Sequence, residues 1–174
     1  KYGTEIDIRS FNSQLILNHE PHQNGDTLIN YLNVYNHGTL VLNIKESGIE
    51  NEVLNIVKKY NIQSYFLLDV EAPFLFRAMK ENIKDIAVRY SEYEPLNFVT
   101  QFNYIFDWVW IDTLTKIPIN KEIDNKLSNF QKCLVCPERW GRKNEISKYK
   151  NYLIKNKINL DAVMTSLDCS KYWV

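Results

Sequence analysis

Short runs of alternating or continuous apolar residues are separated along the chain by segments whose apolar residues recur three and four positions apart. The first pattern predicts β-strands and the second predicts amphipathic helices. Seven strands are expected, at Thr4–Arg9, Leu40–Lys45, Tyr65–Asp69, Ile86–Tyr90, Trp108–Asp112, Lys132–Cys136 and Ala162–Thr165. Six helices are expected between them, at Thr27–Tyr35, Glu50–Tyr60, Pro73–Asn82, Leu96–Tyr104, Lys121–Phe130 and Glu145–Lys155. This alternation is typical of β/α units and a parallel sheet.

The first strand carries a charge at every second position. Glu5, Asp7 and Arg9 share one face, because side chains alternate across a strand, and the opposite face is mostly apolar. In later strands the polar residues gather near the carboxyl end, as at Asn43, Lys45, Asp69, Arg89 and Asp112. A parallel barrel produces this arrangement, since its site forms at the carboxyl ends of the strands. A doubly wound open sheet gives a similar alternation, and periodicity alone does not decide between them.

A hairpin is expected directly after this charged strand. Asn12 and Ser13 lie between two extended runs and suit a tight turn. Asp7 precedes Ser13 by six residues and His19 follows it by six, so an antiparallel hairpin would place both side chains at a similar height. Glu5 and Asp7 on one face repel each other unless a cation neutralises them, and oxygen ligands suit Mg²⁺ or Ca²⁺. Such an ion would polarise a phosphoryl oxygen, and His19 would move a proton.

Three basic side chains on the predicted strands are candidates for holding phosphate oxygens: Arg9, Lys45 and Arg89. A structural role is the alternative for the last two, since strand-end cations also pair with nearby carboxylates such as Asp69 or Glu92. The acidic pair and His19 have structural alternatives too, because charged pairs on strands are often surface salt bridges of little energetic consequence.

The aromatic and sulfur-containing residues of the later strands allow two interpretations. Trp108 and Trp110 would line a sugar or glycerol pocket, or they would fill the core. Cys133 and Cys136 form a C-x-x-C sequence, but an offset of three residues along a strand places them on opposite faces. This argues against a shared metal or an easy disulfide, and the two cysteines are expected to behave as small buried hydrophobic residues.

Composition limits the class of protein. With 174 residues, 45% of them hydrophobic, the chain can bury one sizeable core, and a single domain over residues 1–174 is expected. Its 21 basic and 21 acidic residues give no general field for nucleic acid, so an anionic ligand must be held by a local cluster. Three cysteines cannot all pair, and no apolar run is long enough to span a bilayer. A cytoplasmic protein that binds no nucleic acid and does not insert into membranes is therefore expected.

The stretch "GTEIDIRSFNSQLILNHEPH" resembles the glycerophosphodiester phosphodiesterase motif, in which a Glu-x-Asp strand is followed by a turn and a His-Asp-Pro segment. The stretch "LVLNIKESG" resembles that family's later Glu-x-Lys strand, and "RYSEYE" and "VWIDT" resemble strands of a divergent bacterial branch. The resemblance spans essentially the whole chain. It implies an α/β fold, a TIM (β/α)8 barrel of the phospholipase C-like phosphodiesterase type, and a hydrolase of lipid metabolism.

The chain departs from this family's pattern at several positions. The family's opening strand, which carries His-Arg and one of two catalytic histidines, has no counterpart, so the chain would supply strands 2 to 8 of the barrel. An upstream segment is expected to supply the rest; otherwise, open edges would favour association into an oligomer. Asn43 stands where the family has a metal-ligand Glu, Glu20 replaces an Asp, and Ser166 lies where a late Asp often falls.

The resulting hypothesis is a metal-dependent phosphoric diester hydrolase acting on a glycerophosphodiester-like or other small polar phosphodiester. Its expected site comprises the metal ligands Glu5, Asp7 and Asn43, the catalytic residues His19 and Lys45, and the substrate-binding residues Arg9, Arg89 and Trp110. The first alternative is an impaired barrel that binds a phosphorylated sugar or glycerol ligand without turnover. The second is a flavodoxin-like open sheet with an unrelated role.

Overall fold

The computed structural model describes residues 2–174, which divide into two compact units. Unit 1 extends to Ile86 and unit 2 covers Ala87–Val174. The expectation of one domain over residues 1–174 stays a prediction.

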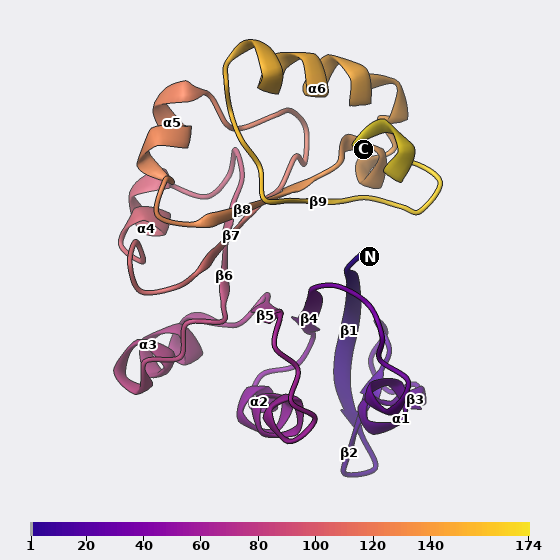
Figure 1. Cartoon of the computed structure of the whole chain (residues 1–174). Coiled ribbons are helices and arrows are strands. Elements are labelled where there is room, and N and C mark those ends of the chain that lie inside the picture. Colours follow the sequence, from indigo (N-terminus) through magenta and orange to yellow (C-terminus); the bar gives the residue numbers. More distant parts are fainter. Residues whose placement is uncertain (1) are drawn as a thin grey trace. The chain divides into compact units, whose positions relative to one another are not determined.

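Unit 1 contains a mixed sheet of five strands in the order β3-β2-β1-β4-β5 (Figure 1). Its strands are β1 (Thr4–Phe11), β2 (Gln14–Leu17), β3 (Asp26–Thr27), β4 (Leu40–Ile44) and β5 (Tyr65–Leu68). Its helices are α1 (Leu28–Asn33), α2 (Glu50–Lys59) and α3 (Ala72–Glu81). Strands β1, β4 and β5 run parallel, whereas β2 and β3 are antiparallel to their neighbours. The carboxyl ends of the three parallel strands therefore meet at one edge of the sheet.

The expected hairpin between β1 and β2 is present. Asn12 and Ser13 both have positive φ, 48° and 61°, as a two-residue turn of the primed type requires. The loop is centred between these two residues, so Asn18, not His19, lies opposite Asp7, and the Asn18 amide donates to the Asp7 carbonyl at 3.1 Å. The expected height match of Asp7 and His19 is thus wrong by one residue, because it placed the centre of the turn on Ser13.

The core of unit 1 includes the apolar face of β1 and both faces of β4 and β5, whose residues are nearly all buried. Ile6 and Ile8 of β1 are 8% and 0% exposed, and their partners Leu42 and Ile44 of β4 are equally buried. The helices contribute their apolar stripes, with Leu28, Leu32, Val53, Leu54, Val57, Phe74, Leu75 and Ala78 buried. Helix α1 is capped by Thr27, whose hydroxyl accepts from the Asn30 amide at 3.1 Å.

Unit 2 contains a parallel sheet of four strands in the order β6-β7-β8-β9 (Figure 1). The strands are β6 (Ala87–Tyr90), β7 (Trp108–Ile111), β8 (Gln131–Val135) and β9 (Ala162–Met164). The helices are α4 (Leu96–Thr100), α5 (Lys121–Lys126) and α6 (Ile146–Lys155), with short 3₁₀ turns η1 (Pro137–Trp140), η2 (Lys143–Glu145) and η3 (Ser170–Tyr172). Strand order follows chain order, as short right-handed crossovers favour.

Two buried features anchor unit 2. Asp124 of α5 is 6% exposed and pairs with Lys132 of β8 at 2.5 Å and with Lys121 at 2.8 Å, which ties the helix to the sheet.

The three cysteines of the chain are free and buried. Cys136 lies in a small apolar cluster with Cys169 and Ile146, and its sulfur accepts from the Trp173 indole at 3.2 Å. The interpretation of the C-x-x-C sequence as two buried hydrophobic residues is confirmed.

The seven expected strands and six expected helices are present, with their ends displaced by no more than a few residues. The expected TIM barrel is wrong, because the strands form a mixed five-stranded sheet and a separate four-stranded parallel sheet. The hairpin partner β2 lies antiparallel beside β1, and β3 extends that edge further. Apolar periodicity reports which segments are strands, but strand pairing depends on contacts between distant segments.

The balanced net charge conceals opposite charges on the two units. Residues 1–86 include eight basic and eleven acidic residues, a balance of −3, and residues 87–174 include thirteen basic and ten acidic residues, a balance of +3. Within the described part of the chain, no helix has the length and apolar character needed to cross a membrane.

Candidate functional site

The charged face of β1 forms as the sequence predicts. Glu5, Asp7 and Arg9 are partly exposed and alternate with the buried Ile6 and Ile8. These polar side chains therefore share the sheet face opposite Ile6 and Ile8.

Strand β4 brings Asn43 beside the two acidic residues of β1. Asn43 pairs in register with Asp7, and its amide nitrogen donates to Glu5 Oε1 at 2.7 Å. Asn43 is only 6% exposed. The three residues expected as metal ligands are thus brought together by the parallel pairing of β1 with β4, and the sequence motif alone could not show that pairing.

Two oxygen atoms of this cluster are buried without a hydrogen bond. Among the described residues, Oδ1 of Asp7 and Oδ1 of Asn43 accept none, although Lys45 Nζ lies 3.2 Å from the former. Lys45 already supplies positive charge to Asp7 Oδ1, whereas a buried acceptor without a donor, such as Asn43 Oδ1, costs about 1–3 kcal/mol, so a cation would suit this position. Over residues 2–174, no group of three or more His, Cys, Asp or Glu side chains is arranged to hold a metal. The donor set here is two carboxylates and one amide oxygen.

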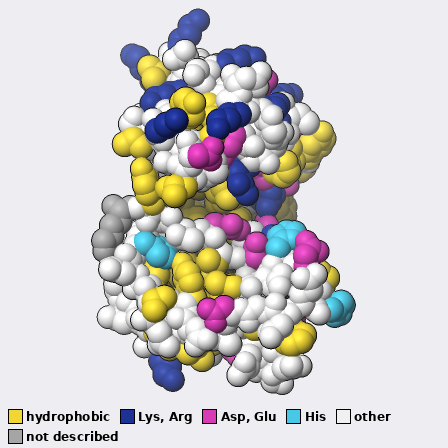
Figure 2. Space-filling model, turned by 90° about the vertical axis from the view of Figure 1, so that its right-hand side faces the viewer, with side chains coloured by type: hydrophobic (Ala, Val, Ile, Leu, Met, Phe, Trp, Pro, Cys, Tyr) yellow, Lys and Arg dark blue, Asp and Glu magenta, His cyan; other side chains and the backbone are white. Residues whose placement is uncertain are grey.

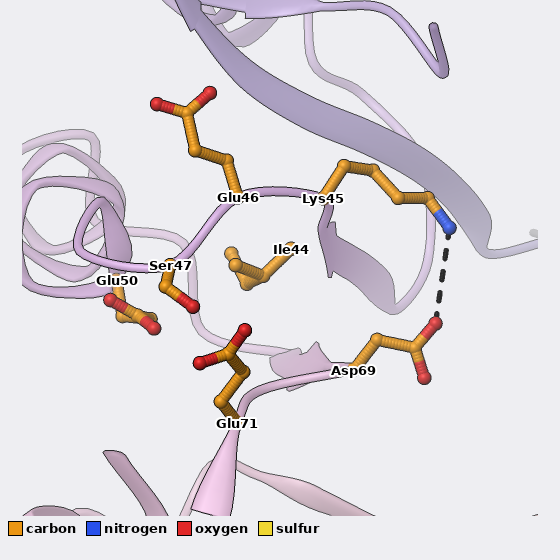
Figure 3. A pocket seen from close by; sticks show the side chains of 7 residues that line it. All are labelled: Ile44, Lys45, Glu46, Ser47, Glu50, Asp69 and Glu71. Carbon is orange, nitrogen blue, oxygen red and sulfur yellow. Dashed lines mark ion pairs between the residues drawn. The ribbon is translucent and has the colours of Figure 1, made fainter. Parts of the chain in front are cut away.

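Lys45 follows β4 directly and places its ammonium group between two strands. Lys45 Nζ lies 3.2 Å from Asp7 Oδ1. It also lies 3.8 Å from Asp69 Oδ2, the ion pair drawn in Figure 3. Asp69 follows β5 in the left-handed region, with φ of 59°, a conformation that Asp tolerates better than most residues. We call Glu5, Asp7, Asn43, Lys45 and Asp69 the strand-end cluster.

A cavity of about 240 Å³ adjoins this cluster. It is lined by Lys45, Ile44, Ser47 and four carboxylates, those of Glu46, Glu50, Asp69 and Glu71. In Figure 3 the side chains of Glu50, Ser47 and Glu71 lie close to one another, while Glu46 points away from them. Hydrogen bonds from Ser10 lower the pKa of the Glu46 carboxyl, with burial opposing the shift. The cavity is acidic and therefore favours a cation over an anion.

The Arg9 side chain joins β1 to the segments that follow β2 and β4. Its Nε donates to the His19 carbonyl at 2.9 Å and its Nη1 donates to the Lys45 carbonyl at 2.7 Å. The guanidinium thus holds the ends of β2 and β4 beside β1. The expected contact of Arg9 with phosphate stays a prediction, and the observed contacts position the backbone around Lys45.

His19 lies just beyond β2 with its ring in solvent. Its side chain is 66% exposed, and its Nδ1 lies 2.8 Å from Glu20 Oε1. The ring of His19 therefore contacts Glu20, and none of its hydrogen bonds or ion pairs among the described residues reaches the strand-end cluster. All three histidines belong to unit 1, and Figure 2 shows histidine side chains at the surface with acidic side chains nearby.

Arg89 and Trp110, the other two residues expected at the site, belong to unit 2. They pair in register on β6 and β7, and Trp110 is 4% exposed, which favours a role in the core. Arg89 forms an ion pair with the buried Asp112. The Trp140 indole also donates to Asp112, at 2.9 Å. Sequence reasoning missed Trp140 because nothing in the loop after β8 marks it.

The sequence also missed the carboxylates that surround Lys45. Glu46 and Glu71 lie two and three residues after the ends of β4 and β5, and this position was the signal that could have found them. Comparison of the chain with known protein families and with curated proteins finds no match. The resemblance to glycerophosphodiester phosphodiesterases therefore stays a prediction.

Proposed function

We propose that the chain is a metal-dependent phosphoric diester hydrolase acting on a small polar phosphodiester. One observation carries this proposal: the buried Oδ1 atoms of Asp7 and Asn43 lie on paired residues beside Glu5 and accept no hydrogen bond from the described residues. Buried polar atoms in proteins are nearly always paired. The Lys45 ammonium lies 3.2 Å from Asp7 Oδ1, whereas Asn43 Oδ1 has no hydrogen-bond donor among the described residues, and a cation at this edge of the sheet would serve both oxygens.

The residues present fit a hard divalent ion such as Mg²⁺ or Ca²⁺. Glu5, Asp7 and Asn43 would hold it through oxygen atoms, and Asn43 brings no charge, so affinity is lower than for three carboxylates. Bound there, the ion supplies polarisation of a phosphoryl oxygen. The surrounding acidic side chains of Asp69 and Glu71 add to the attraction for a cation.

The chain's own side chains would divide the remaining work. Lys45, held by Asp7 and Asp69, neutralises a phosphate oxygen as a point charge. Arg9 keeps the Lys45 backbone in place through its carbonyl. His19 transfers a proton to or from the reacting oxygen, which requires its exposed ring to exchange Glu20 for substrate.

A second candidate is a protein that binds an organic phosphate without hydrolysing it. The specific observation in its favour is the solvent-exposed His19 ring, whose Nδ1 is engaged by Glu20. The presence of Asn43 in place of a carboxylate points the same way, since it lowers the negative charge available to hold an ion.

Hydrolysis assays separate these candidates. We expect the wild-type protein to hydrolyse bis(p-nitrophenyl) phosphate or glycerophosphodiesters with Mg²⁺ or Ca²⁺, and chelator to abolish the activity. His19→Ala should lower kcat/KM at least about a hundredfold, as loss of a general acid or base typically does. Asp7→Asn should lower it too, because it removes one charged ligand of the ion. Gln23→Ala is the control, because Gln23 is exposed in the same loop as His22 and carries no proposed role. Binding of glycerol 3-phosphate with no turnover would establish the second candidate instead.

We also propose a reducing, cytoplasmic setting for the protein. All three cysteines are free and buried. Disulfides are rare in such compartments.

A further inference from the structure

A second and larger hollow shares the Lys45–Glu46 segment with the acidic cavity. Its volume is about 510 Å³, against about 240 Å³ for the acidic cavity, and both cavities include Lys45 and Glu46 in their walls. The larger hollow is bounded by the end of the β1 strand, the hairpin turn and the loop after β2. A group bound at Lys45 can therefore extend into either space.

The two hollows differ in charge. Four carboxylates and one ammonium line the smaller cavity, whereas Arg9, Lys45 and the imidazole of His22 face a single carboxylate, Glu46, in the larger. That carboxylate is already engaged, because its Oε2 accepts from the Ser10 amide at 3.0 Å. The larger hollow is thus the better place for the organic portion of an anionic ligand.

Two ring-bearing residues give this hollow an apolar wall. Phe11 and Pro21 both line it, next to the polar groups. Phe11 is the last residue of β1 and pairs with Gln14 across the tight turn, so the backbone that carries its ring is held in the sheet. Arg9 is likewise held by two backbone carbonyls, at 2.9 and 2.7 Å. Phe11 and Arg9 are therefore both held in place by hydrogen bonds, the first through its backbone and the second through its side chain.

The size of the hollow exceeds what a phosphate or glycerol group needs. Pockets of about 300–1,000 Å³ in proteins take ligands of several rings or a ring with substituents, usually against apolar walls with a few polar groups. We infer that this hollow is the subsite for a planar ring substituent of an organic phosphate, whose phosphoryl group lies at Lys45. This inference rests on the proposed function for the position of the phosphoryl group.

A matched pair of probes isolates the ring. Phenylphosphonate and methylphosphonate carry the same anionic group, differ by the ring, and contain no ester to hydrolyse, so calorimetric titration of the full chain measures binding alone. We expect phenylphosphonate to bind about tenfold more tightly, the lower part of the range for loss or gain of one aromatic stacking contact. Phe11→Ala should remove this preference and leave methylphosphonate binding unchanged.

Two further variants keep the test specific. Phe11→Leu retains apolar bulk without an aromatic face and should keep part of the preference. Phe76→Ala removes an aromatic side chain that is 55% exposed on α3, and it should leave both affinities unchanged.

The outcomes separate this inference from the proposed function. Equal binding of the two phosphonates, or the same loss for both in Phe11→Ala, would overturn the ring subsite even if the protein hydrolyses phosphodiesters. A Phe11-dependent preference for phenylphosphonate together with no hydrolysis of any diester would uphold the subsite and overturn the hydrolase. Failure of both phosphonates to bind would overturn the subsite as well.

Discussion

Replacing the central amide of the strand-end cluster by a carboxylate tests whether a cation belongs there. In Asn43→Asp the side chain keeps its size and gains a charge next to Glu5 and Asp7. Without a cation this charge is repelled, and with a cation it becomes a third anionic ligand. We therefore expect the variant to be less stable than the wild type in chelator and to recover stability when Mg²⁺ or Ca²⁺ is added.

The expected loss of stability in Asn43→Asp has two causes, a lost hydrogen bond and a buried charge. The wild-type amide donates to Glu5 Oε1 at 2.7 Å, and a hydrogen bond to a charged group contributes about 1.5–3 kcal/mol. The introduced carboxylate is placed at a position only 6% exposed, which raises its pKa, and each unit of that shift costs about 1.4 kcal/mol at neutral pH. Together these predict a loss of about 3 kcal/mol in the free energy of unfolding. A cation at about 100 times its Kd would restore about 2.7 kcal/mol.

Urea unfolding of the wild type and the variant, in chelator and in excess Mg²⁺ or Ca²⁺, measures the loss of stability and its recovery with the cation. Asn103→Asp is the matched control, because the Asn103 Oδ1 is also buried without a hydrogen bond from the described residues but belongs to unit 2 and not to the strand-end cluster. The control should show no response to the cation. A cation response of Asn43→Asp no larger than that of Asn103→Asp would refute the assignment of the cluster as a cation site.

Two other predictions concern the fold. Burial opposes the charged form of Asp124, but hydrogen bonds from Lys121 and Lys132 more than offset it and hold its pKa below the usual range. This stabilisation is present above the unfolded pKa of about 3.9 and is lost as the pH falls through the lower folded value. Asp124→Asn should therefore lower the free energy of unfolding by about 3 kcal/mol at neutral pH. Thermal unfolding at decreasing pH should show the wild type and the variant becoming more alike in stability, and a difference that stays constant would contradict this reasoning. Ser13→Gly should stabilise the protein by about 0.5 kcal/mol, measured by urea unfolding. Glycine relieves the strain of a serine in the left-handed region, roughly 1–2 kcal/mol, and this exceeds the conformational entropy that it adds to the unfolded chain, about 0.4–1 kcal/mol. Destabilisation by this change would show that the φ of 61° at Ser13 carries no strain.

Local structure was predictable to within a few residues at each end. The strand at Leu40–Ile44 and the helix at Glu50–Lys59 follow from apolar spacing, and the primed turn follows from Asn12 and Ser13. Each of these depends on neighbouring residues only, since helix and strand periods and turn preferences are local properties of the chain.

The candidate site was partly predictable for the same reason. Alternation placed Glu5 and Asp7 on one face of β1, but the sequence could not show that Asn43 donates to Glu5 or that Lys45 lies between Asp7 and Asp69. Those contacts join residues far apart in the chain and arise from the parallel register of β1 with β4 and β5.

By itself the sequence determined which segments are strands and helices, which face of each strand is apolar, and which polar side chains share a face. Only the tertiary structure decided that the strands form two separate sheets, that β2 and not a parallel strand lies beside the second half of β1, and that His19 faces solvent beside Glu20. The physical reason is that periodicity is encoded residue by residue, whereas strand partners and register are set by the packing of segments that lie far apart along the chain.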